Sequence, residues 1–254
     1  MSLRWKSELD AVLGPERCEV SISPGLFGTR VAAHGEGIGN SPGAITLALQ
    51  ALVASGQPML PRRARLTVPD ERVYFAMLPA ASPWSRRLEV ATRHLVESLG
   101  RQDLRVQISL VDAGRSWLVA AIEEADRQAW AQAFSEAGVA LLGIQPALTR
   151  DLLRIASEVP TDGVLVLIRR EGVMLLLLRA GELTDLRWER CSEAEFEQRV
   201  EAFVESVRTD AEPLPVVVFV DEYSASDAIS GIATAHRWRE LRAVPAPQPS
   251  ECVA

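Results

Sequence analysis

Apolar residues recur along the chain at two spacings. Short runs of β-branched and aromatic residues bounded by glycine, proline or aspartate predict strands joined in hairpins. Longer segments with an apolar residue every three or four positions predict helices. In the first part of the chain the expected strands, the first six paired as three successive hairpins, are Cys18–Ile22, Thr29–Ala33, Ala64–Val68, Val73–Leu78, Val106–Val111, Trp117–Ile122 and Val139–Ile144. The expected helices are Pro42–Ser55, Pro83–Leu99, Glu123–Ala137 and Pro146–Ala156.

A second cycle of elements is expected after the segment Glu158–Gly163, whose proline and glycine indicate a boundary between lobes. It begins with a three-stranded meander. Ser192 and Glu195 have the spacing of a capping box, which predicts the start of a helix that continues to Arg208. The remaining expected elements are strands Val164–Ile168, Val173–Leu178, Leu183–Trp188 and Val216–Val220, and a helix Ser226–Thr234.

The order of these elements predicts the fold class. Three strands, a helix, a strand and a further helix follow one another in the second half, and less regularly over Cys18–Ile144. Such repeated units indicate a two-lobed α/β fold with mixed sheets covered by helices. The expected division is an N-terminal lobe over 1–157 with an inserted helical and hairpin subdomain, a C-terminal lobe over 158–244, and a proline-rich linker over 245–254.

Composition narrows the function classes. The net charge of −7 makes the chain a poor binder of phosphate backbones, so no nucleic-acid partner is expected. The cysteines, Cys18, Cys191 and Cys252, are widely spaced and odd in number, which indicates neither a disulfide framework nor a thiolate zinc site and favours a reducing compartment. No apolar run approaches the roughly 20 residues of a membrane span, and the N-terminus lacks the apolar region of a signal peptide.

Three stretches carry a resemblance to a known family. They are RARLTVPDERVYFAMLPAASPW (Arg63–Trp84), SWLVAAIEEADRQAWAQAFSEAGVALLGIQPAL (Ser116–Leu148) and DGVLVLIRREGVMLLLLRAGELTDLRWER (Asp162–Arg190). They resemble the cytoplasmic domain of the type II secretion platform proteins called GspL or EpsL, and the related type IV pilus protein PilM. Both belong to the actin-like, ribonuclease-H-like superfamily, so the resemblance implies a two-lobed actin-like fold.

The resemblance also implies where nucleotide would bind. Actin-like nucleotide binders place an Asp-x-Gly-rich hairpin at the start of each lobe, where backbone amides hold phosphates and the carboxylate holds the metal shell. At the first such place this chain reads SISPGLFGTR (Ser21–Arg30), without an aspartate and with Pro24 removing an amide donor. At the second it reads LIRREGVMLL (Leu167–Leu176), with arginines where acidic and glycine residues are expected. No bound cofactor and no enzymatic activity are therefore expected.

The function implied by the resemblance is that of a scaffold. The chain is expected to act at the cytoplasmic face of a bacterial inner membrane, recruiting the N-terminal domain of a secretion ATPase and contacting other platform proteins. In the secretion branch a membrane helix follows such a proline-rich tail. A second copy of this chain, forming a homodimer, is a further candidate partner. Two alternatives remain: a divergent PilM-like protein that binds ATP through an unorthodox glycine loop at Gly35–Gly39, and a stand-alone protein of this fold with an unrelated binding role.

Other candidate sites favour simpler explanations. Gly35, Gly37 and Gly39 do not match the G-x-G-x-x-G fingerprint, so a mobile loop is the expectation there. Asp112-Ala113-Gly114 has the chemistry of a tight turn. Asp221 and Glu222 follow an apolar strand, where capping carboxylates are common. The three histidines, His34, His94 and His236, have no metal-ligand spacing in the sequence, and no metal site is expected.

One helix offers a candidate partner surface. Phe196, Val200, Phe203, Val204 and Val207 form an apolar stripe on the helix that begins at Ser192, which predicts its buried side. The opposite side carries Glu195, Glu201 and Glu205. A solvated helix surface is the simplest interpretation of these carboxylates, and the functional alternative is an acidic strip that binds a basic partner.

Overall fold

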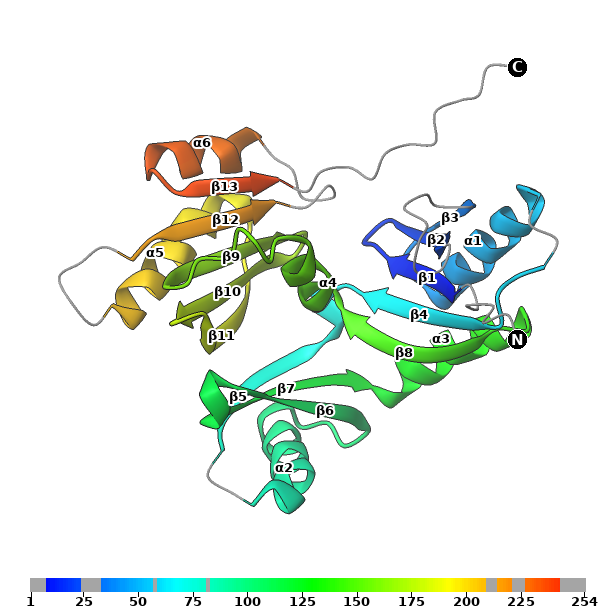
Figure 1. Cartoon of the computed structure of the whole chain (residues 1–254), viewed down its shortest axis with the longest axis horizontal. Coiled ribbons are helices and arrows are strands. Elements are labelled where there is room, and N and C mark those ends of the chain that lie inside the picture. The colour runs from blue at the N-terminus through cyan, green and yellow to red at the C-terminus, as the bar shows by residue number, and fades with distance from the viewer. Residues whose placement is uncertain are drawn as a thin grey trace, which may run out of the picture. The chain divides into compact units, whose positions relative to one another are not determined.

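The computed structural model describes residues 8–23, 33–56, 59–80, 83–208, 214–220 and 227–242 (Figure 1). The chain divides into two compact units. Unit 1 consists of the described residues up to Arg72 together with Glu123–Arg150. Unit 2 consists of Val73–Ile122 and the described residues from Asp151 onward. Within the described residues, no helix is long and apolar enough to cross a membrane.

Unit 1 is built on a mixed sheet with the strand order β3-β2-β1-β4-β8. The first three strands form an antiparallel meander, and β4 pairs in parallel with both β1 and β8. Helix α1 packs beside β3 and β2, and α3 packs beside β8 (Figure 1). The bounds are β1 Glu8–Leu13, β2 Arg17–Ser23, β3 His34–Ile38, β4 Arg63–Val68, β8 Ala140–Pro146, α1 Pro42–Ala54 and α3 Glu124–Glu136.

Two of the expected pairings in unit 1 are wrong. The opening strand of the sheet is β1, which the sequence analysis did not identify, and the described partner of β2 on its other side is β3 rather than Thr29–Ala33. Residues 29–32 lie outside the described part of the chain. Strands β4 and β5 (Tyr74–Pro79) do not form a hairpin, since β4 pairs with β1 and β8 while β5 pairs with β7 in another sheet.

The segment between β4 and β5 is a short 3₁₀ turn, η1 (Asp70–Arg72), with a structural role. The side chain of Asp70 is fully buried, and its Oδ1 accepts a hydrogen bond of 2.9 Å from the backbone N–H of Leu148. Leu148 lies in the first turn of α4 (Ala147–Arg154), where amide groups lack partners within the helix. Asp70 in this segment therefore binds the start of α4, and the segment does not form the turn of a hairpin.

The glycines of β3 allow a close helix–strand contact. A Cβ on Gly35 would lie 2.3 Å from the backbone oxygen of Ala48, and one on Gly37 would lie 2.0 Å from that of Ala44. Ala44 and Ala48 lie on the buried side of α1. The expectation of a mobile glycine loop is therefore wrong at these two positions, because they belong to a strand on which a helix backbone rests. Gly39, which follows β3, differs from these two because its φ of +104° requires the conformational freedom of glycine.

Unit 2 repeats the strand order of unit 1. Its mixed sheet has the order β11-β10-β9-β12-β13, with an antiparallel meander from β9 to β11 and parallel pairing of β12 to β9 and β13. The predicted meander, helix, strand and helix are all confirmed, whereas β13 was not predicted. The bounds are β9 Gly163–Arg169, β10 Gly172–Arg179, β11 Glu182–Arg190, η4 Glu193–Glu195, α5 Phe196–Val207, β12 Val216–Val220, α6 Asp227–Ala235 and β13 Arg239–Arg242.

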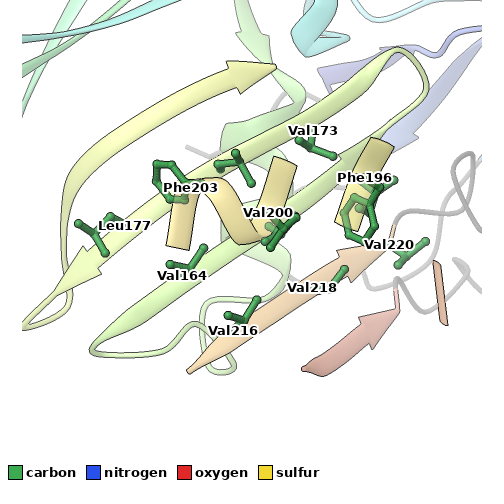
Figure 2. Close-up of a cluster of buried hydrophobic side chains, with 12 residues drawn as sticks. Val164, Val173, Leu177, Phe196, Val200, Phe203, Val216, Val218 and Val220 are labelled. Carbon is green, nitrogen blue, oxygen red and sulfur yellow. The ribbon is translucent and has the colours of Figure 1, made fainter. Parts of the chain in front are cut away.

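The core of unit 2 forms where α5 covers one face of this sheet (Figure 2). Phe196, Val200 and Phe203 of α5 are buried against alternate residues of β9, β10 and β12. The predicted apolar stripe of this helix is therefore confirmed. Strands β9 and β12 are buried at every position, which is typical of strands covered on both faces.

A smaller sheet is inserted between β4 and α3. It has the order β5-β7-β6 and is covered by α2 (Arg87–Leu99), with Ala91, Leu95 and Trp117 in its core. Its other bounds are η2 Trp84–Arg86, β6 Leu104–Val111, η3 Asp112–Gly114 and β7 Ser116–Glu123. This insert groups with unit 2, where β5 lies beside β11. The expected hairpin across Asp112–Gly114 is confirmed.

Candidate functional site

The hairpin that opens unit 1 is β1–β2, and its turn is Gly14-Pro15-Glu16. The N–H of Gly14 donates to the oxygen of Arg17 at 2.8 Å, and the oxygen of Glu16 accepts from Gly39 N–H at 2.6 Å. Pro15 has no N–H to offer. Two successive positions of the turn therefore offer no amide to a ligand, and the next residue, Glu16, is exposed. The sequence analysis placed this hairpin too late, at Ser21–Arg30, of which residues 24–30 lie outside the described part of the chain.

A carboxylate does stand within the first strand. Asp10 is half-buried on β1, opposite Ser21, whose hydroxyl donates to the backbone oxygen of Asp10 at 3.4 Å. It precedes Gly14 by four positions, whereas the Asp-x-Gly pattern needs two. An acid on β1 and a glycine in the turn after it are therefore both present, but not at the spacing of that pattern.

The hairpin that opens unit 2 turns at Arg170–Glu171 between β9 and β10. The carboxylate of Glu171 lies 3.0 Å from the guanidinium of Arg190 on β11. A Cβ on Gly172 would lie 2.1 Å from the backbone oxygen of Glu189, so glycine is needed there for the approach of β11. Contacts with β11 therefore occupy both the acid and the glycine at this turn, the acid through an exposed ion pair and the glycine through strand packing.

Arg169 ends β9 at the base of the same turn and is directed into the protein. Its Nη1 lies 3.0 Å from Oδ2 of Asp151 on α4, and both side chains are almost fully buried. A buried charge is tolerated only when it is paired, so Asp151 offsets the charge that Arg169 carries. The arginine is thereby committed to an internal ion pair of unit 2.

Each of the three carboxylates of the predicted acidic strip contacts a different residue. Glu195 accepts hydrogen bonds from Ser192 N and Oγ at 2.9 and 2.8 Å, completing the predicted capping box. These bonds, together with the cation Arg199, lower the pKa of Glu195. Glu205 lies 3.8 Å from Arg208 and remains largely exposed. Glu201 lies 3.5 Å from Nδ1 of His236, a residue beyond α6.

The group formed by Glu197, Glu201 and His236 was not identified from the sequence. Glu197 Oε1 lies 2.5 Å from Nε2 of His236. The spacing of the two glutamates, one helical turn apart, was a usable signal for a shared helix surface. Nothing in the local sequence indicated that His236 joins them, since the fold alone brings α5 and the residue after α6 together.

The remaining sequence candidates have simple structural roles or fall outside the described residues. Asp112 and Ala113 adopt positive φ, and Asp112 pairs with Arg115 at 2.5 Å, so the tight-turn prediction is confirmed. Asp221 and Glu222 lie outside the described part of the chain.

Comparisons with known proteins bear on the fold. No protein-family model and no curated protein matches the chain. A solved structure from Bacteroides thetaiotaomicron, described as having an actin-like ATPase fold and unknown function, matches with a TM-score of 0.64 at 11% identity, covering 96% of this chain and 93% of that one. The chain has an actin-like fold. This confirms the fold that the sequence resemblance implied.

Two further actin-like neighbours come from the families that the resemblance named. The PilM–PilN type IV pilus biogenesis complex matches with a TM-score of 0.67 at 13% identity, covering 95% of this chain and 89% of that one. The cytoplasmic domain of EpsL, an inner membrane component of the Vibrio cholerae type II secretion system, matches with a TM-score of 0.59 at 14% identity, covering 94% and 91%. The actin-like fold of this chain thus extends over nearly the whole length of each neighbour.

Proposed function

We propose that this chain is a non-catalytic scaffold of a type II secretion or type IV pilus platform at the cytoplasmic face of a bacterial inner membrane. In this role it recruits the assembly ATPase and holds it in place, and it does not itself hydrolyse nucleotide. The EpsL domain and the PilM–PilN complex support the setting, since both share the fold over nearly the full length of this chain.

The observation that carries the non-catalytic part of the proposal is the state of the two opening hairpins. A phosphate hairpin works through free amides, a correctly spaced carboxylate and a glycine that admits the ligand. In β1–β2 the amide of Gly14 is already bonded and Pro15 has none. In β9–β10, the missing side chain of Gly172 allows the backbone of β11 to approach, and Arg169 is buried against Asp151. In both opening hairpins, these residues therefore make contacts within the fold.

The partner surface in this proposal is the acidic side of α5. Glu201 and Glu205 lie one turn apart on it, and the chain has a net charge of −7, which favours a basic partner surface. Rim charges of this kind act mainly on association rate and on salt dependence. The N-terminal domain of the assembly ATPase is the expected partner, with other platform proteins as further contacts.

The experiment is a binding titration between the full chain and the N-terminal domain of the assembly ATPase from the same genome, without nucleotide. The proposal predicts saturable binding that weakens as salt is raised. The double variant Glu201→Lys/Glu205→Lys should weaken binding several-fold and flatten its salt dependence, while Glu89→Lys on α2, an equally exposed glutamate, should not. Absence of binding by the unaltered chain would remove the scaffold role.

A second candidate function is ATP binding of the PilM kind, and Asp10 favours it. This residue places a carboxylate in the first strand of unit 1, where the first hairpin of an actin-like nucleotide binder keeps one. The glycine loop first considered for this role is excluded at Gly35 and Gly37, which pack under α1. If nucleotide binds, Asp10→Asn should abolish the binding in a variant that a thermal melt shows to be folded.

A further inference from the structure

Three metal-ligating side chains converge on one surface of unit 2. Glu197 and Glu201 lie one turn apart on α5, and His236 follows the end of α6. One donor atom from each of the three lies within 4.8 Å of the others. Glu197 and Glu201 are exposed and His236 is half-buried, so the group is open to solvent.

The position of His236 is fixed by the turn that ends α6. Arg237 adopts a left-handed backbone with φ +58°, the N–H of Trp238 donates to Ala233 O at 2.8 Å, and that of Arg237 donates to Thr234 O at 3.2 Å. These bonds have the pattern of a Schellman motif, in which glycine usually takes the left-handed position. A non-glycine residue there is a costly conformation that the surrounding structure must stabilise.

Aromatic packing holds the imidazole ring against α5. The ring of His236 stacks on Trp238 at a centroid distance of 4.7 Å, and Trp238 forms a T-shaped pair with Phe196 at a centroid distance of 6.1 Å. Phe196 is buried in the core beneath α5, one position before Glu197. The histidine and the two glutamates are therefore held to the same rigid part of unit 2, as a preorganised ligand set requires.

Neither glutamate pairs with an arginine or a lysine in the part of the chain that the structure describes. Among the described residues, the ion pairs of Glu197 and Glu201 are with His236 alone, and the nearest arginine on the helix, Arg199, is directed instead to Glu189 and Glu195. Like charges one turn apart repel each other. A cation between the two carboxylates would remove this repulsion and satisfy both.

We propose that Glu197, Glu201 and His236 form a binding site for a zinc-class divalent cation. One imidazole nitrogen and two carboxylate oxygens are ligands that zinc accepts, and three protein ligands leave a fourth tetrahedral position for water. Calcium and magnesium prefer oxygen ligands in larger number or with several retained waters, so the nitrogen donor favours a transition metal. The site lies apart from the hairpins, and it shares Glu201 with the acidic surface proposed to bind the partner.

The test is a zinc titration of the full chain after treatment with a chelator, followed by calorimetry and metal analysis. One zinc ion per chain is expected. Glu197→Gln, Glu201→Gln and His236→Ala should each weaken binding by at least about tenfold, since loss of even an outer hydrogen-bond partner of a metal ligand costs that much. Millimolar magnesium should not compete.

The matched controls are the other two histidines. His34 lies 3.0 Å from Glu36, a histidine–glutamate pair without a third donor among the described residues, and His94 is exposed on α2. His34→Ala and His94→Ala should bind zinc as the unaltered chain does. Circular dichroism melts of all five variants show whether each is folded. Failure of the folded, unaltered chain to bind zinc, or full retention of binding by His236→Ala, would overturn the proposal.

Discussion

Nη1 of Arg169 lies 3.0 Å from Oδ2 of Asp151, with only 3% and 0% of the two side chains exposed to solvent. Removal of one member of a buried ion pair takes this partner from a charge that stays buried, which typically costs about 3–5 kcal/mol. Asp151→Asn and Arg169→Met should each lower the free energy of unfolding by about that amount, measured by chemical denaturation. The double variant Asp151→Leu/Arg169→Met should recover most of the loss. A loss below about 1 kcal/mol in both single variants would contradict a buried ion pair.

The glycines of β3 yield a second prediction. A Cβ at Gly35 or Gly37 would overlap the backbone of α1, so Gly35→Ala and Gly37→Ala should each destabilise unit 1 by about 1–3 kcal/mol or more. Gly143→Ala is the matched control in the same sheet, because a Cβ there meets nothing within 4 Å. Denaturant midpoints compare the three. Equal effects at Gly35 and Gly143 would show that α1 does not rest on β3.

The thiol of Cys18 is predicted to be unreactive. Burial raises its pKa to about 12, with a smaller contribution from Glu19, and burial also raises the pKa of Cys191. Since the thiolate is the nucleophile, alkylation of Cys18 at pH 8 should require unfolding. Peptide mapping after iodoacetamide treatment, with and without denaturant, measures this. Rapid labelling of Cys18 in the folded protein would place β2 at the surface.

The raised pKa of Cys18 also predicts that the folded protein becomes less stable at alkaline pH. The folded-state pKa of Cys18 lies above its ordinary value of 9.0, so the unfolded chain loses this proton first as pH rises. The contribution of the neutral thiol is complete below about pH 9 and declines as pH rises from about 9 towards 12. A Cys18→Ala variant should show less of this alkaline loss.

The capping box at Ser192 predicts a change in the pKa of Glu195. Hydrogen bonds from Ser192 N and Oγ favour the ionised carboxylate, so the folded-state pKa lies below the ordinary value of 4.5. The stabilisation from Glu195 is therefore present above that value and is lost as pH falls through the folded-state pKa. Ser192→Ala should move the pKa of Glu195 upward in a carbon-detected NMR titration. An unchanged pKa would mean that the Ser192 hydroxyl does not donate to the Glu195 carboxylate.

Periodicity in the sequence predicted unit 2 well because its signals are local. The apolar stripe of α5, the Ser192–Glu195 spacing and the run Val216–Val220 each depend on neighbours in the chain. Strand β13, with the sequence RELR, was missed because its polar residues give no strand signal, and it pairs through its backbone at the end of the described sheet order.

The errors in unit 1 and in the site have a common cause in long-range packing. Gly35 and Gly37 resemble a loop in sequence because the reason for them, the backbone of α1, enters only on folding. The pairing of β4 with β1 and β8 joins segments separated by many residues, so turn chemistry at Pro69–Arg72 could not exclude a hairpin. His236 meets Glu197 across 39 positions, a distance that no spacing rule covers.

The most direct test of the central claim is a calorimetric titration of the full chain with Mg-ATP. The claim is that the residues of the two opening hairpins stabilise the fold and do not bind a nucleoside triphosphate. The expected result is no saturable heat up to millimolar nucleotide, in a preparation that still binds the ATPase domain. Binding tighter than millimolar, abolished by Asp10→Asn, would contradict it.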